Sequence, residues 1–207
     1  METEMIRTSL AIFVLLVAPL SAESSSALPG CKPRPEIAKI IHEQLGSNEF
    51  DKLSFADQVA RRRKVLSELI ASYPREIDPQ KRLISATRYW EDSVQPGSFA
   101  SLQEHYRQQV KEHPEDPLTL DLAANALIGT DTAEAIRLLE AAKAEAPQFV
   151  WPDLDLADIY TSGKFADKQK FTDHLTAFWI ASPGATDSMA RWLLVKDISP
   201  VEIWLLF

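Results

Sequence analysis

The sequence predicts an all-α fold, a stack of helical hairpins, and three observations lead to this class. Pro79, Pro114, Pro147 and Pro183 recur at intervals of 35, 33 and 36 residues, and a period of about 34 residues is typical of stacked helix pairs. Apolar residues follow helical spacing in most segments, and no segment sustains the period-two alternation of a strand. The chain has only six glycines, which disfavours folds built on many tight turns.

Residues 1–22 are predicted to be a secretory signal peptide. Leu10–Leu20 carries no charge and is too short to span about 30 Å of hydrocarbon as a helix. Arg7 precedes this stretch, and small residues ending at Ala22 follow it, as at a signal cleavage site. Glu2 and Glu4 make the start unusually acidic, so translation starts either at Met1 or at Met5.

Residues 23–35 are predicted to be a flexible leader rich in Ser and Pro. Cys31, the only cysteine of the chain, is either a lone thiol in this leader or a lipid-anchored residue of a bacterial lipoprotein. Leu28 lies where a lipoprotein processing site requires leucine, but ten residues separate Cys31 from the apolar stretch. A single cysteine excludes an internal disulfide.

The helices are expected in order along the chain. Residues 36–78 hold two N-terminal helices, at 36–45 and 57–72, which end at Gly46 and before Pro74. Three helix pairs are then expected at 81–93 and 99–113, 118–128 and 132–145, and 152–160 and 167–181. Asp131 is well placed as an N-cap, with Glu134 completing a capping-box pattern.

Residues 186–207 are expected to form a capping helix, at 189–195, and an apolar tail. The tail, 201–207, has six apolar residues in seven, and a soluble protein rarely leaves such a patch in water. The tail therefore docks back on the helices, holds a partner, or marks a chain that continues.

The middle helix pair resembles a tetratricopeptide repeat (TPR). The small, large and closing positions of that motif match Leu122, Ala123, Ala126, Ala135, Leu139, Ala142 and Pro147. Alanines let two antiparallel helices approach closely, and larger residues fill the gap to the next pair. One repeat, about 116–149, matches well and is flanked by two degenerate ones, so the resemblance implies TPR-like hairpins over 79–185 and a short right-handed α-solenoid.

The resemblance also implies a groove for a peptide or helix, lined by the first helix of each pair. Carried over position by position, its residues are Thr87, Arg88, Glu91, Leu120, Asp121, Ala124, Leu127, Trp151, Leu154, Asp155 and Asp158. This mixed apolar and acidic set predicts a partner segment that is apolar with basic flanks. Trp151 either anchors the partner at the groove edge or packs between hairpins.

No motif in the sequence predicts catalysis, a cofactor or a metal. The four histidines have no partner at metal-ligand spacing and are expected at surfaces or helix ends. Asp153 is expected to compensate a helix dipole. The net charge of −8 disfavours nucleic-acid binding, which needs a concentrated basic surface. The basic run Arg61–Lys64 is expected to be a solvated helix face.

These observations predict an exported, periplasmic or secreted protein-binding or assembly module of a bacterial envelope. We expect it to have no catalytic activity of its own, no cofactor, and no transmembrane helix in the mature chain. The alternative is the helical front part of a larger envelope thiol–disulfide oxidoreductase, whose thioredoxin-like domain would lie beyond Phe207. A membrane tether applies only if Cys31 is lipidated.

Overall fold

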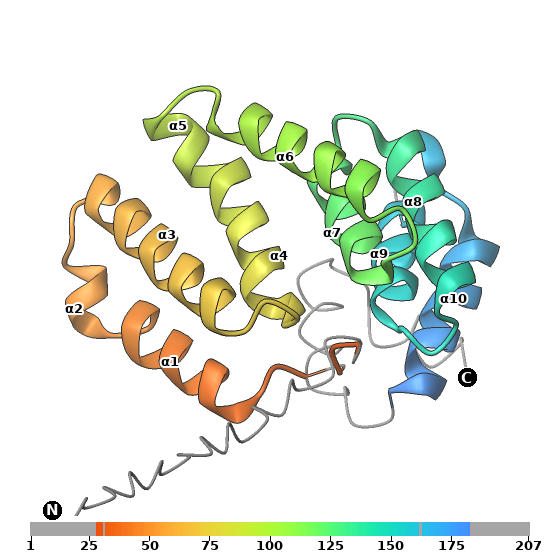
Figure 1. Cartoon of the computed structure of the whole chain (residues 1–207), viewed down its shortest axis with the longest axis horizontal. Coiled ribbons are helices and arrows are strands. Elements are labelled where there is room, and N and C mark those ends of the chain that lie inside the picture. Colours follow the sequence, from red (N-terminus) through yellow and green to blue (C-terminus); the bar gives the residue numbers. More distant parts are fainter. Residues whose placement is uncertain (1–27, 31, 162, 183–207) are drawn as a thin grey trace, which may run out of the picture.

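The computed structural model describes residues 28–30, 32–161 and 163–182, and these residues are mostly helical, with no strand among them. The elements, in chain order (Figure 1), are α1 (Pro35–Leu45), α2 (Asn48–Asp51), α3 (Phe55–Ser72), α4 (Ile77–Ala86), the π-helical turn η1 (Thr87–Glu91), α5 (Asp92–Val94), α6 (Ser98–Glu112), α7 (Pro117–Leu127), α8 (Thr132–Glu145), α9 (Trp151–Tyr160), the 3-10 turn η2 (Gly163–Phe165) and α10 (Lys168–Ala181). The all-α prediction is confirmed.

Helices that are close in sequence lie side by side, so the fold runs across the molecule from α1 to α10 (Figure 1). Each helix packs on its neighbours in the chain: α1 on α3, α3 on α4, α6 on α7, α7 on α8, α8 on α9 and α9 on α10. Two further contacts join helices that are not consecutive in the chain, because α7 also touches α4 and α9. These contacts bring the first helices of the three predicted pairs together.

Side-chain caps begin five of the ten described α-helices, α2, α3, α7, α8 and α10, and the cap expected at Asp131 is one of them. Asp116, Asp131 and Asp167 each accept a hydrogen bond from the backbone N–H three residues later, at α7, α8 and α10. Such a cap satisfies a backbone donor that the helix leaves unpaired. The expected capping box at α8 is only half formed, because the carboxylate of Glu134 binds Arg137 instead of the backbone of Asp131.

The tightest packing lies between α7 and α8. The small and large positions singled out in the sequence are buried there: Leu122, Ala123, Ala126, Ala135, Leu139 and Ala142. The alanines place the two backbones close together, and Leu139 fills the space between them and the neighbouring helices.

The structure differs from the sequence prediction most at the first helix of the first pair. This helix begins at Ile77 rather than Lys81, with Pro79 inside its first turn, a position where proline is tolerated. It then continues through the π-helical turn η1 into α5. The short elements α2 and η2 were not predicted, and the second N-terminal helix begins at Phe55, two residues before the expected start.

Several predictions concern residues outside the described part of the chain. These are the signal peptide, the choice of start codon, Cys31, Pro183, the helix at 189–195 and the tail at 201–207. Within the described part, no helix combines the length and the apolar character that crossing a membrane requires.

Enlarging a buried alanine of α8 tests the close approach of α7 and α8. Ala142 is fully buried, so Ala142→Leu should lower the free energy of unfolding by about 1–3 kcal/mol through overpacking. Urea unfolding followed by circular dichroism measures the loss. Ala144→Leu, at an exposed position of the same helix, is the control and should change stability little. Equal effects of the two substitutions would contradict the packing described here.

Candidate binding face

The residues predicted for a groove lie on the first helices of the three pairs, on the segment from α4 to η1, on α7 and on α9. Six of them are buried: Thr87, Glu91, Leu120, Asp121, Ala124 and Leu127. The other five are partly exposed: Arg88, Trp151, Leu154, Asp155 and Asp158. The buried set takes part in packing within the fold, and contact of the partly exposed set with a partner stays a prediction.

Lys81 brings two of the predicted residues together, although sequence reasoning did not select it. Its Nζ lies 3.0 Å from Oδ2 of Asp121 and 2.5 Å from Oδ2 of Asp155. Asp121 is fully buried, and the side chains of Lys81 and Asp155 are 14% and 13% exposed. This charge triad joins α4, α7 and α9. Asp121 and Asp155 lie 40 and 74 residues after Lys81 in the sequence.

Burial dominates the electrostatics of the triad. It raises the pKa of Asp121 to about 7, because the Lys81 cation opposes this shift only in part and the Asp155 carboxylate adds to it. Oδ1 of Asp121 has no hydrogen-bond donor within the described part of the chain. Burial lowers the pKa of Lys81, but Asp121 and Asp155 together raise it above its usual value. The ammonium therefore stays charged, and Asp121 takes up a proton near neutral pH.

Trp151 packs against the triad. Its ring centroid lies 5.0 Å from Lys81 Nζ, a cation–π distance, and its indole N–H donates to the carbonyl oxygen of Gly30 at 3.0 Å. Asn125 of α7 completes the surroundings, since its side-chain amide donates to Asp155 at 3.5 Å. Trp151 thus packs within the fold, and its role as an anchor for a partner stays a prediction.

The π-helical turn η1 holds the other end of this segment in place. The hydroxyl of Thr87 donates to Glu91 at 3.2 Å, and the buried carboxylate of Glu91 also pairs with Arg63 of α3. Arg88 donates to the backbone oxygen of Asn125 at 2.5 Å. The turn is therefore tied to both α3 and α7. π-Helical turns are rare and occur frequently at functional sites.

Beside the triad, α1, α3 and α4 enclose a groove with a volume of about 670 Å³. It is lined by Pro33, Ala38, Ile41, His42, Leu45, Gly46, Arg62, Leu66, Asp78, Lys81, Arg82, Ser85 and Trp90. We call it the α1–α4 groove. Lys81 belongs to both the groove and the triad, so the two features are continuous.

A second buried charge cluster joins α8, α9 and α10. Asp153 Oδ1 accepts from Lys143 Nζ at 2.6 Å and from His174 Nδ1 at 2.8 Å. The His174 ring also stacks on Tyr160, with centroids 5.7 Å apart. The side chains of Asp153 and His174 are only 8% and 12% exposed, so Asp153 does more than compensate a helix dipole, and His174 is not a surface histidine.

Comparison with known proteins adds no assignment to this geometry. The chain matches no protein-family model, no curated protein and no solved structure. Among the described residues, no group of three or more His, Cys, Asp or Glu side chains could hold a metal ion. The described part of the chain is a mostly helical fold whose inner helices meet at a buried charge triad beside an open groove.

Sequence reasoning missed Lys81, Asn125, Arg62 and Trp90, all of which shape this face. One signal was present for the triad: Thr87, Asp121 and Asp155 lie 34 residues apart, which puts all three at one position of successive first helices. Two buried carboxylates at such a position require a cation nearby, and Lys81 lies one and a half turns before Thr87. The groove had no comparable signal.

Removing the cation of the triad should destabilise the fold. Lys81→Met leaves Asp121 and Asp155 buried without their cation, and breaking a buried ion pair in this way costs about 3–5 kcal/mol. Urea unfolding at pH 8 measures the loss. Lys64→Met is the control, because the Lys64 side chain is 75% exposed, and it should change stability by less than about 1 kcal/mol. A Lys81 variant as stable as this control would show that the triad contributes nothing.

The raised pKa of Asp121 predicts how stability depends on pH. Between the ordinary pKa of 3.8 and about 7, the folded state holds a proton that the unfolded chain has released. The free energy of unfolding therefore falls as pH rises through this window, by an amount on the order of 2–4 kcal/mol.

Asp121→Asn should remove this part of the pH dependence, while Lys81 keeps Asp155 as its partner. Urea unfolding of the wild type and the variant between pH 4 and 8 gives the difference. Asp173→Asn makes the same substitution at an exposed position of α10. It should leave the pH dependence of the free energy of unfolding as in the wild type. Parallel curves for the wild type and Asp121→Asn would contradict the assigned shift.

Proposed function

We propose that this chain is a protein-binding or assembly module built as a short right-handed solenoid of TPR-like helical hairpins. The ordered packing of each helix on its chain neighbours supports this, since solenoid repeats contact only their neighbours. The contacts of α7 with α4 and α9 add support, because the first helices of successive repeats share one face in such a stack.

The observation that carries the proposal is the α1–α4 groove at the edge of that face. Its apolar wall includes Trp90, which is 38% exposed, and large exposed aromatic side chains are typical anchors of protein interfaces. A volume of about 670 Å³ has room for several side chains of a partner segment. The π-helical turn that holds Trp90 is fixed by buried polar contacts, so the wall is preorganised for binding.

The proposal includes export. The predicted signal peptide at residues 1–22 places the mature protein in the periplasm or outside the cell, where it acts by holding a partner and without catalysis of its own. A lipid on Cys31 would tether the same module to a membrane.

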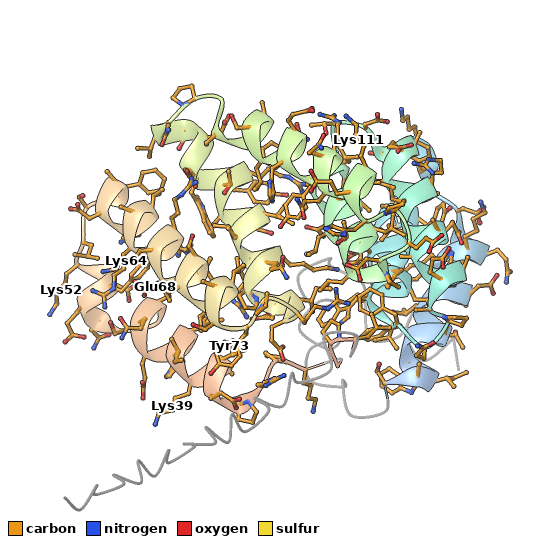
Figure 2. The ribbon with its side chains drawn as sticks, viewed as in Figure 1. Lys39, Lys52, Lys64, Glu68, Tyr73 and Lys111 are labelled. Carbon is orange, nitrogen blue, oxygen red and sulfur yellow. The ribbon has the colours of Figure 1, made fainter. Side chains whose placement is uncertain are left out.

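Site-specific photocrosslinking in the host envelope tests this function. Replacing Trp90 with p-benzoylphenylalanine keeps an aromatic side chain in the groove, and illumination should give one adduct of defined mass, identified by mass spectrometry. The control carries the same residue at Lys111, an exposed position on the outer side of α6 (Figure 2), and should give no such adduct. Adducts from neither position, or equally from both, would contradict binding at this face.

A further inference from the structure

Within the α1–α4 groove, one cation stands out by having no counter-charge. Arg82 donates to Asp78 at 2.8 Å, and Lys81 is held by the carboxylates of the triad. Among the described residues, no carboxylate lies within ion-pair distance of Arg62, whose guanidinium stacks on Trp90 at 4.2 Å from the ring centroid and faces Phe50 at 5.1 Å.

The neighbours of Arg62 in the basic run 61–64 are all engaged elsewhere. Arg63 pairs with Glu91, and Lys64 faces Glu68 one turn along α3, where both side chains are exposed (Figure 2). Arg61 donates to Gln44, at 3.2 Å to its backbone oxygen and 2.6 Å to its side-chain oxygen. The run is therefore not a uniform solvated face, because Arg62 alone turns into the groove.

Partial burial makes the isolation of Arg62 costly. Burial lowers the pKa of Arg62, with no opposing charge to raise it, although a guanidinium remains charged at any physiological pH. An arginine stacked on an aromatic ring keeps its edge donors free for a planar acceptor. A carboxylate that enters the groove would supply the missing counter-charge.

The other residues of the groove indicate which side chains of a partner would bind beside that carboxylate. Ile41 and Leu45 from α1 and Trp90 from η1 form its partly exposed apolar lining, with the fully buried Leu66 of α3 beneath them. Apolar side chains of a partner are favourable here because they remove this surface from water. A basic partner is disfavoured, because Asp78, the carboxylate in the lining, is already paired with Arg82 and the unpaired charge that a partner meets is the Arg62 cation.

We propose that the α1–α4 groove binds an apolar peptide segment that carries acidic residues, with a carboxylate on Arg62 and apolar side chains against Ile41, Leu45 and Trp90. This inference rests on the proposed binding function and deepens it. It replaces the basic-flanked partner expected from the acidic residues of α9, since Asp155 already has Lys81 as its counter-charge.

Fluorescence anisotropy with two rhodamine-labelled synthetic peptides tests the inference. Both are about twelve residues long with apolar residues at helical spacing, and they differ only in having glutamate or lysine between them. The wild-type protein should bind the glutamate peptide more tightly at physiological salt. Arg62→Glu should weaken that binding by about tenfold or more and reverse the preference.

Arg61→Glu is the matched control, because it makes the same charge change one residue away, on a side chain that contacts Gln44 outside the groove. It should bind both peptides within about twofold of the wild type, as long-range effects of a rim charge are screened at this salt. Circular dichroism and thermal unfolding check that both variants are folded, and Arg62→Gln serves in place of Arg62→Glu if that variant is not.

Two results would overturn the inference: no preference of the wild type for the glutamate peptide, or equal effects of the Arg62 and Arg61 substitutions. Binding of anionic phospholipid vesicles that needs Arg62, with no binding of either peptide, would also overturn it in favour of a lipid surface. If the Trp90 crosslink persists while Arg62 proves irrelevant, the binding function stands and only the chemistry of the segment is wrong. If the Trp90 crosslink is absent and peptide binding does not depend on Arg62, the proposed binding function is wrong as well.

Discussion

The buried pairing of Lys81 with Asp121 and Asp155 is the interaction on which the inner face depends. It is the only charge network that joins α4, α7 and α9 in the described part of the chain, and it links residues 74 positions apart. Buried ion pairs add little net stability over an apolar core but fix the relative placement of the groups that they join. The triad therefore sets how the three first helices align, while the apolar contacts between them supply most of the stability.

The same constraint shapes the groove beside the triad. Lys81 fixes the middle of α4 against α7, and the bond from Arg88 to Asn125 fixes the following turn η1 against α7. The helix between these two points forms one wall of the groove. The π-helical turn, held by Thr87 and Glu91, then brings Trp90 under the guanidinium of Arg62. A groove wall held at two points loses little freedom when a partner binds, which favours affinity.

The helices could be predicted from the sequence because local signals set them. Proline, glycine and the Asp131 cap mark the helix boundaries within a few residues, and the alanines of α7 and α8 predict that these two helices pack closely. The triad could not be predicted in the same way, since a lysine side chain usually reaches water. Lys81 is buried because α7 and α9, which are distant in the sequence, bring Asp121 and Asp155 next to it in the fold. Neither the π-helical turn nor the pairing of Asp153 with His174 has a sequence pattern of its own.

The charge of the whole chain is a poor guide to the charge of its groove. The protein carries a net charge of −8, and its first helices contribute the carboxylates that suggested a basic partner. Folding neutralises those carboxylates from within, because Lys81 is placed between Asp121 and Asp155. The same folding leaves Arg62, from a run of four cations, without an anion among the described residues. A partner interacts with the charges that are not paired within the fold. In the α1–α4 groove this unpaired charge is the positive charge of Arg62.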